Sequence, residues 1–216
     1  LGSIGFRHGS KPGVLGGTSQ CALTIHSSRT RFAGRLNSGV RPHKMTFSFR
    51  CNSCGEAHEG IPTFGADMPS IAQWISAADR PSRVDLGTDD CVVDGERFLV
   101  RGCLEIPVQG ESDPFVWGVW VDISQANFDQ WAGAFKLKER SHIGPFPGYL
   151  GTALPCYPDT FNHHVVMHLR DDGIRPYIEV SQSNHPLHIE QCNGITHERL
   201  AEIYREVMHG APGREA

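Results

Sequence analysis

The sequence lacks a long hydrophobic run, and this absence excludes the usual membrane-spanning helix. Its most apolar stretch, FVWGVWV at residues 115–121, is interrupted by a glycine, whereas a spanning helix needs about 20 apolar residues. The first residues also lack the apolar segment of about 7–15 residues that is typical of a signal peptide. We therefore expect a cytoplasmic protein with no membrane partner.

The sequence also lacks the short motifs of common catalytic sites. It contains no G-x-S-x-G elbow, no P-loop, no H-E-x-x-H zinc motif and no G-x-G-x-x-G fingerprint. The spacing of its carboxylates does not single out an acid/base pair. An enzyme is therefore not the favoured interpretation, although a cysteine nucleophile beside a histidine distant in sequence stays open.

Paired cysteines are scarce, and this excludes a secreted disulfide scaffold. Of the seven cysteines, only Cys51 and Cys54 lie close together in the sequence. A disulfide framework is normally denser and built from pairs. Reduced thiols in a cytosolic protein are the simpler interpretation.

Acidic residues are absent from the first part of the chain. Residues 1–44 contain seven Lys or Arg and no Asp or Glu, and they are rich in Gly and Ser with no apolar period. Such a segment cannot bury enough surface to offset its chain entropy, so we expect it to be disordered. Three interpretations of this segment are open. It is upstream sequence attached by a misplaced start codon before Met45, or a basic arm for nucleic acid, or an organelle transit peptide. We favour the first.

The rest of the chain is acidic. It holds 13 basic and 24 acidic residues, a formal charge of −11, and this argues against nucleic acid because phosphate is repelled. We expect one globular domain over residues 45–210, with a disordered C-terminus at residues 211–216.

Hydrophobic periodicity in this domain predicts strands joined by hairpins. Asp94-Gly95 is a strong signal for a two-residue hairpin turn, and helical stripes begin after Pro69, Ser124 and Thr196. Residues 141–160, rich in Pro and Gly, predict an irregular segment. The predicted fold class is α+β, with an antiparallel sheet covered by about three helices and a zinc-ribbon-like knuckle at its start. Strands are expected at residues 47–51, 91–93, 98–106, 115–123, 161–170 and 174–180.

The knuckle is the pair Cys51-x-x-Cys54, which resembles half of a zinc ribbon. His58 is the predicted third ligand. Cys91 is the predicted fourth, because it begins a strand that could pair beside residues 47–51, and Cys103 is the alternative. A reduced cysteine pair in a turn without metal remains open, because no second C-x-x-C exists.

Segments spread over the domain resemble a known family. They are C-x-x-C-G-x-x-H from residue 51, DDCVVDG from 89, RFLVRGCLEIPV from 97, FVWGVWVDIS from 115, YPDT from 157, HLR from 168 and HPLHIEQCNGIT from 185. Residues 47–209 thereby resemble domain of unknown function family 2199, a family of uncharacterised bacterial proteins. The resemblance implies a bacterial cytosolic protein and no known reaction.

Polar and aromatic residues in these segments are candidates for a ligand pocket. The alternative for each is structural: a solvated sheet face with ion pairs, or aromatic burial. His164 and His168 share a strand face but lie about 13 Å apart, too far to chelate one ion. The candidates are Arg101, Glu105, Trp120, His168, Arg170, His185 and Glu190.

These observations favour a non-enzymatic binding or interaction module stabilised by zinc, with an unknown protein or a small anionic ligand as partner. The alternative is a small hydrolase or transferase with a pocket around Arg101, His168 and His185. A zinc-ribbon nucleic-acid binder is disfavoured by the acidic domain.

Overall fold

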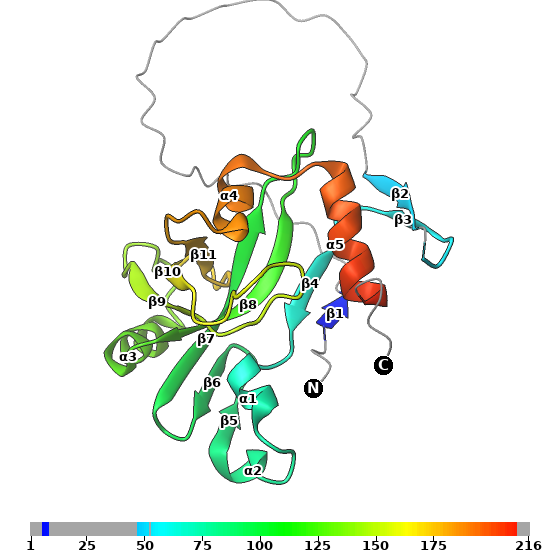
Figure 1. Cartoon of the computed structure of the whole chain (residues 1–216). Coiled ribbons are helices and arrows are strands. Elements are labelled where there is room, and N and C mark those ends of the chain that lie inside the picture. The colour runs from blue at the N-terminus through cyan, green and yellow to red at the C-terminus, as the bar shows by residue number, and fades with distance from the viewer. Residues whose placement is uncertain (1–5, 9–46, 52, 211–216) are drawn as a thin grey trace, which may run out of the picture.

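The computed structural model describes residues 6–8, 47–51 and 53–210 of the chain. A mixed nine-stranded sheet, in the order β1-β4-β8-β9-β10-β11-β7-β6-β5, forms its centre (Figure 1). The strands are β1 (Phe6–His8), β4 (Thr63–Ala66), β5 (Val84–Leu86), β6 (Asp90–Val93), β7 (Arg97–Ile106), β8 (Phe115–Ile123), β9 (Phe146–Leu150), β10 (His164–His168) and β11 (Tyr177–Val180).

Five of these strands close into a barrel. β7 and β8 pair from Phe98↔Ile123 to Ile106↔Phe115, and β8 continues through β9 and β10 to β11. β11 then returns to β7 in parallel at Tyr177↔Cys103. Because side chains alternate along a strand, one set from each strand fills the barrel and forms the main core. This set includes Leu104, Trp117, Val119, Met167 and Ile178.

The predicted antiparallel sheet is therefore only part of the fold. β4 runs parallel to β8, and the β11–β7 pair that closes the barrel is also parallel. A second buried cluster lies outside the barrel, where Trp120 and Leu99 pack with Cys91.

Local signals placed several elements correctly. Asp94 and Gly95 both have positive φ, 55° and 68°, and join β6 to β7 as predicted. The expected strand over residues 115–123 is β8. Ser124 and Thr196 cap the helices α3 (Gln125–Ala134) and α5 (His197–His209), accepting hydrogen bonds from the backbone N–H groups of Asn127 and Arg199.

The helices differ more from expectation. The helix after Pro69 is short and leaves Trp74 64% exposed, and Pro81 lies in the first turn of the next helix, where its missing N–H is tolerated. α4 was not predicted. The helices in the described part of the chain are α1 (Ser70–Trp74), α2 (Arg80–Arg83), α3 (Gln125–Ala134), α4 (Pro186–Asn193) and α5 (His197–His209).

β9 lies within the segment predicted to be irregular. Phe146, Gly148 and Leu150 are buried along it. Gly148 is required by close packing, because a Cβ there would lie 2.6 Å from the carbonyl oxygen of Asp122 on β8. The proline and glycine that suggested a loop therefore permit a close strand pair.

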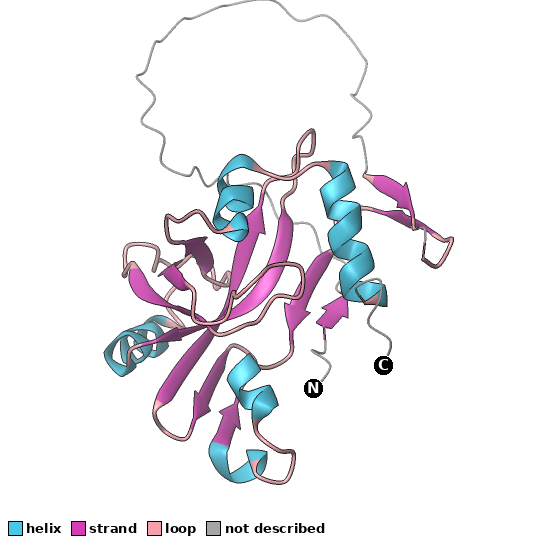
Figure 2. Ribbon diagram, viewed as in Figure 1, coloured by secondary structure: helices cyan, strands magenta, loops and turns pink. Residues whose placement is uncertain are grey.

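The first strands of the domain form a separate hairpin. β2 (Ser48–Arg50) and β3 (Ala57–Glu59) make a two-stranded sheet beside α5 (Figure 2). Of the segment predicted to be disordered, residues 6–8 form β1 on the edge of β4; the rest of residues 1–44, and residues 211–216, lie outside the described residues. Among the described helices, none has the length and apolarity to cross a membrane.

Candidate metal centre

The turn between β2 and β3 carries the cysteine knuckle. The N–H of Gly55 donates to the carbonyl of Cys51 at 2.8 Å, and the N–H of Cys51 donates to the carbonyl of Glu56 at 2.8 Å. Gly55 has a φ of +75°, which glycine adopts without strain. The guanidinium of Arg50 donates to the Gly55 carbonyl at 2.8 Å. This bonding folds the chain so that the two sulfurs come together.

The Cys51 sulfur lies in a setting that favours its thiolate. Burial acts against ionisation, but the backbone N–H groups of Cys54 and Ser53 hydrogen-bond the sulfur. Together these effects hold the pKa of Cys51 below its usual value. The thiolate is the form that binds a metal.

A third donor comes from the other end of the domain. Cys51, Cys54 and His209, in the last turn of α5, have donor atoms that all lie within 4.8 Å of one another. Cys51 is buried, whereas Cys54 and His209 are exposed. These three residues form a group that can hold a metal ion.

His58 lies beside this group. Its Nε2 is 3.4 Å from the sulfur of Cys54. Two donors on one tetrahedral zinc, with bonds of about 2.3 Å to sulfur and 2.0–2.1 Å to nitrogen, lie about 3.5 Å apart. The Cys54–His58 separation fits that geometry, but the nitrogens of His58 do not lie within 4.8 Å of all three donors of the group.

Aromatic packing fixes the hairpin on α5. The ring of Tyr204 lies 4.5 Å from His58 and 5.2 Å from Phe49, measured between centroids, and Phe47 contacts His197 at 5.0 Å. The hydroxyl of Tyr204 is 3.0 Å from Nδ1 of His58. This second contact orients the imidazole so that Nε2 faces Cys54, as outer partners of ligating histidines commonly do.

The structure does not bring Cys91 to this group. Cys91 lies on β6, buried in the cluster with Leu99 and Trp120. The prediction assumed that its strand pairs beside residues 47–51, but β6 pairs with β5 and β7. Cys103, the alternative, lies on β7 opposite Tyr177. His209 occupies the place predicted for Cys91, and the knuckle is held against α5 rather than against the sheet.

Part of the predicted ligand pocket is an ion-pair network on the outer face of the barrel. Arg170 donates to Glu105 at 2.6 Å. Arg101 lies over Trp120, with its Cζ 5.6 Å from the ring centroid, and burial and the charge of Arg175 lower the pKa of Arg101. Trp120 is fully buried, so it offers no open stacking surface.

The remaining candidates have partners on other elements. His168 pairs with Glu179 at 2.9 Å. The Nδ1 of His185 accepts the N–H of Leu187 at the start of α4. Glu190 accepts from Arg199 of α5 at 2.8 Å and also from the Tyr157 hydroxyl. Arg101, His168 and His185 therefore each have their own structural contacts and do not form one constellation in the described residues.

Sequence reasoning missed His209 and Tyr204. No local spacing connects them to the knuckle, since both lie near the far end of the domain. A weak signal existed for Tyr204, which belongs to the predicted apolar stripe of the last helix. For His209 the signal was its place in the last turn of that helix.

Comparison with protein families identifies the family of this chain. Residues 50–195 match the family described as uncharacterized protein conserved in bacteria, DUF2199. No curated protein and no solved structure matches the chain significantly. Because the match covers most of the chain, from the knuckle to the end of α4, the chain belongs to the DUF2199 family.

Proposed function

We propose that this chain is a binding module whose N-terminal hairpin is fastened by a structural zinc ion. Cys51, Cys54 and His209 would hold the ion, with His58 as the fourth ligand. One observation carries this proposal. Cys51 and His209 are 158 residues apart in the sequence, yet their donor atoms lie within 4.8 Å of each other and of the donor atom of Cys54.

The donor set favours zinc over other metals. Two thiolates and two imidazoles match the tetrahedral sites of structural zinc, whereas calcium and magnesium prefer oxygen ligands. Four protein ligands would leave no open position for a substrate or water. A structural role is therefore favoured over a catalytic one.

The hairpin is too small to be stable without further contacts. β2 and β3 are three residues each and belong to no larger sheet. An isolated two-stranded hairpin is at best marginally stable in water. The aromatic contacts to Tyr204 support one part of it, and the ion would hold its turn.

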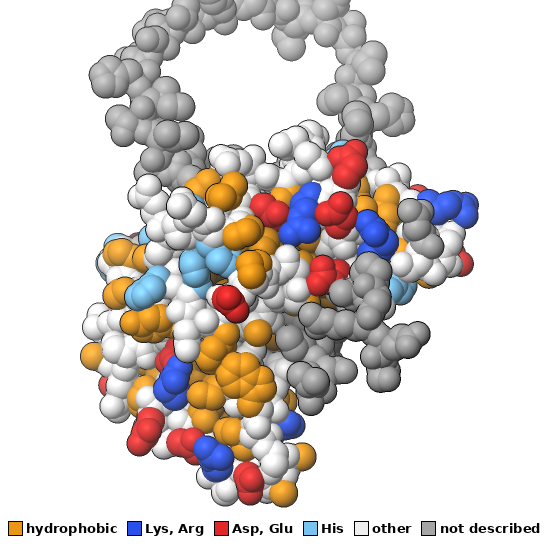
Figure 3. Space-filling view, in the orientation of Figure 1, with side chains coloured by type: hydrophobic (Ala, Val, Ile, Leu, Met, Phe, Trp, Pro, Cys, Tyr) orange, Lys and Arg blue, Asp and Glu red, His pale blue; other side chains and the backbone are white. Residues whose placement is uncertain are grey.

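A non-nucleic-acid partner fits the charge of the domain. On the face shown in Figure 3, acidic and basic side chains are interspersed and form no single basic patch. A protein or a small molecule is the partner class that this supports. The structure does not favour the hydrolase or transferase alternative, because its three residues have separate contacts.

Metal analysis of the purified full chain tests the proposal. We expect one zinc per chain, and we expect Cys54→Ser to lose the metal and lower the melting temperature by several degrees. A loss of about 1 kcal/mol lowers the melting temperature of a domain this size by roughly 2–4 °C. Absence of stoichiometric metal, with an unchanged melting temperature for Cys54→Ser, would contradict the zinc.

The chain offers a matched control in Cys192→Ser. Cys192 is exposed like Cys54, and its sulfur is also near a histidine four residues away, 3.7 Å from Nε2 of His188. We expect Cys192→Ser to keep both metal and melting temperature. Equal effects of the two substitutions would show that the loss is not specific to the knuckle.

A further inference from the structure

An open cleft lies on the side of the barrel where β8, β9 and β10 neighbour each other. Its volume is about 710 Å³, within the usual range of small-molecule sites. The start of α3 and the residue that follows β11, Ser181, also line it. The cleft is built from different elements than the hairpin and α5.

The strand register places three polar side chains in a row across this cleft. Asp122 of β8 pairs with Tyr149 of β9, and Tyr149 pairs with His164 of β10. Directly opposed residues point to the same face, with Cβ atoms about 5 Å apart. Gly148 makes this row possible, since a larger residue would collide with the backbone of Asp122.

The formal charges in the cleft cancel. Arg97 and Asp122 are its basic and acidic residues, and the guanidinium of Arg97 donates to the Asp122 carboxylate. Burial raises the pKa of Asp122, although the Arg97 hydrogen bond counteracts it. Since the pair is already neutralised, a strongly charged ligand would have to break it. The cleft suits an uncharged ligand better.

The remaining polar groups are those that recognise hydroxyls. Asn127 and Asn162 carry amides, and Ser181 and Tyr149 carry hydroxyls. Each of these side chains can both donate and accept hydrogen bonds, as every sugar hydroxyl also does.

The cleft also presents an aromatic surface. Tyr149 is 46% exposed although it belongs to a strand. His164 contacts its ring at 4.7 Å between centroids and helps fix its orientation. An exposed, oriented ring offers an apolar surface beside a polar tip, which can receive the C–H face of a sugar ring.

We propose that this cleft binds an uncharged, hydroxyl-rich small molecule of the monosaccharide class, with Tyr149 beneath the sugar ring and Asp122, Asn162 and His164 bonded to its hydroxyls. This inference names a ligand class for the proposed binding module, and it rests on the proposal that the chain is a binding module. It does not depend on zinc, because none of the four proposed metal ligands lines the cleft.

Amide NMR of the ¹⁵N-labelled full chain tests this proposal. The probes are methyl glucoside, methyl galactoside and N-acetylglucosamine, with glucuronate and glucosamine as the anionic and cationic counterparts. We expect at least one uncharged sugar to shift the amides of Asp122, Tyr149 and His164 saturably, and to bind more tightly than either charged probe. No saturable shift with any of the three uncharged sugars, or tighter binding of a charged probe, would overturn the proposal.

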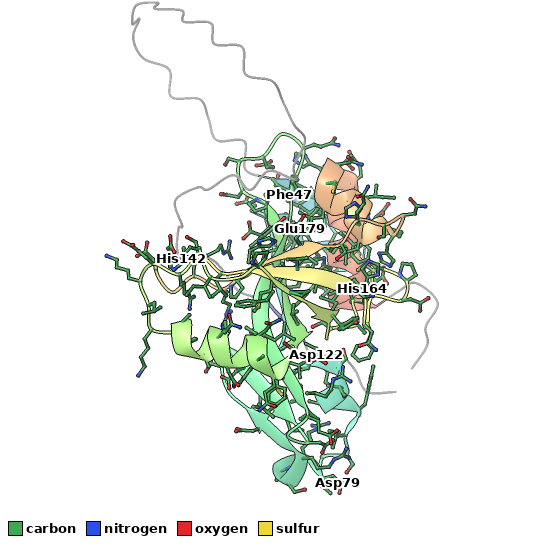
Figure 4. All side chains as sticks on the ribbon, turned by 90° about the vertical axis from the view of Figure 1, so that its left-hand side faces the viewer. Phe47, Asp79, Asp122, His142, His164 and Glu179 are labelled. Carbon is green, nitrogen blue, oxygen red and sulfur yellow. The ribbon has the colours of Figure 1, made fainter. Side chains whose placement is uncertain are left out.

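Two variants and a control locate the binding. Tyr149→Ala is expected to weaken binding about tenfold, as loss of one well-placed contact does. Asn162→Gly removes the amide and keeps the positive φ of 62° at this position, so it is expected to weaken binding without disturbing the backbone. His142→Ala changes an exposed histidine that does not line the cleft and lies away from it in Figure 4; it is expected to bind normally.

The outcomes separate this proposal from the zinc centre. Metal content and melting temperature are measured on the same preparation. A chain that holds zinc but shifts no cleft amide would refute the sugar cleft alone, and a chain that binds sugar without zinc would refute the metal alone. Unchanged affinity in both Tyr149→Ala and Asn162→Gly would also refute the sugar cleft.

Discussion

Tyr204 of α5 contacts His58 both through its ring and through its hydroxyl, which lies 3.0 Å from Nδ1. It is buried, and burial and the nearby sulfurs of Cys54 and Cys51 raise its pKa, so the phenol stays protonated. If His58 binds a metal through Nε2, its Nδ1–H donates to this oxygen. We expect Tyr204→Phe to keep the fold and to weaken zinc affinity about 10-fold or more, as loss of such outer contacts does. Competition with a zinc chelator measures this.

The control for this substitution is Tyr149→Phe, which removes a hydroxyl from an exposed tyrosine away from α5. It should leave zinc affinity unchanged. Equal affinity of Tyr204→Phe and the unaltered chain would mean that the hydroxyl does not position His58.

Arg140 is a buried arginine whose guanidinium donates its described hydrogen bonds to backbone carbonyl groups. It is 2% exposed, and its guanidinium donates to the carbonyls of Phe135, Arg170 and Ile174 at 3.2, 2.8 and 2.9 Å. Removing it leaves three carbonyls without these donors, so Arg140→Ala should lower the free energy of unfolding by about 3 kcal/mol. Urea denaturation measures this loss.

Lys136→Ala is the matched control for Arg140→Ala, because Lys136 is an exposed cation in the same loop between α3 and β9. Its effect should stay within about 0.5 kcal/mol, as for most surface substitutions. A similar small loss for Arg140→Ala would show that the three hydrogen bonds add little stability.

Asp171 is expected to make the stability of the folded chain depend on pH. The backbone N–H groups of Ser141 and Arg140 and the Ser141 hydroxyl donate to its carboxylate, and they lower its pKa. A lowered folded-state pKa gives stability that is present above the unfolded value of about 3.9 and is lost as the pH falls through the folded value. The stability gap between the unaltered chain and Asp171→Asn should therefore close below about pH 4.

Melting temperatures of both proteins between pH 2.5 and pH 7 test this closure. A gap that keeps its size across the whole range would show that the charge of Asp171 is not responsible.

At this scale the sequence predicted residues with local signals and missed those brought together by the fold. Cys51, Cys54 and His58 lie within eight consecutive residues, so spacing alone marked them as ligand candidates. His209 could not be found in that way, because its approach depends on where the last turn of α5 falls. The row of Asp122, Tyr149 and His164 depends on the register of three strands, which no short motif encodes.

If the proposed zinc is bound, the hairpin of β2 and β3 is the element that we expect to depend most on it. The hairpin packs on α5 through Phe49 against Tyr204 and Phe47 against His197, whereas β7 and β8 are paired along their length inside the barrel. Removing zinc with a chelator should raise amide hydrogen exchange in residues 47–60, and in the end of α5, while β7 and β8 stay protected.

Mass spectrometry of peptides from the full chain, before and after chelation, measures this pattern. The strands of the barrel are the internal control. Exchange that rises equally in hairpin and barrel, or in neither, would contradict a local fastening.

Elements with strong local chemistry were predicted, and those defined by packing were not. Asp94-Gly95 favours a tight turn, and Ser124 and Thr196 each precede a helical apolar stripe, so the elements beside them were placed correctly. β9 was missed because Pro147 and Gly148 read as a loop, although Gly148 serves the close approach to β8. α4 was missed because Pro186 opens a helix whose buried face has only Leu187 and Gln191.

At the scale of the whole molecule, the barrel is closed by a single described register pair, Tyr177↔Cys103. Closure turns consecutive hairpins into one core around Trp117 and Leu104. The sequence indicated the hairpins but not their closure, because the parallel pairing of β11 with β7 joins segments far apart in the chain. The group of Cys51, Cys54 and His209 also joins distant parts of the chain, from the start of the domain to the end of α5.

X-ray absorption at the zinc edge of the metal-bound full chain tests the central claim most directly. Two thiolates and two imidazoles should give a four-coordinate first shell of two sulfurs at about 2.3 Å and two nitrogens at about 2.0–2.1 Å. His209→Ala should remove one nitrogen from that shell. A shell without sulfur, or one that His209→Ala leaves unchanged, would contradict the proposed centre.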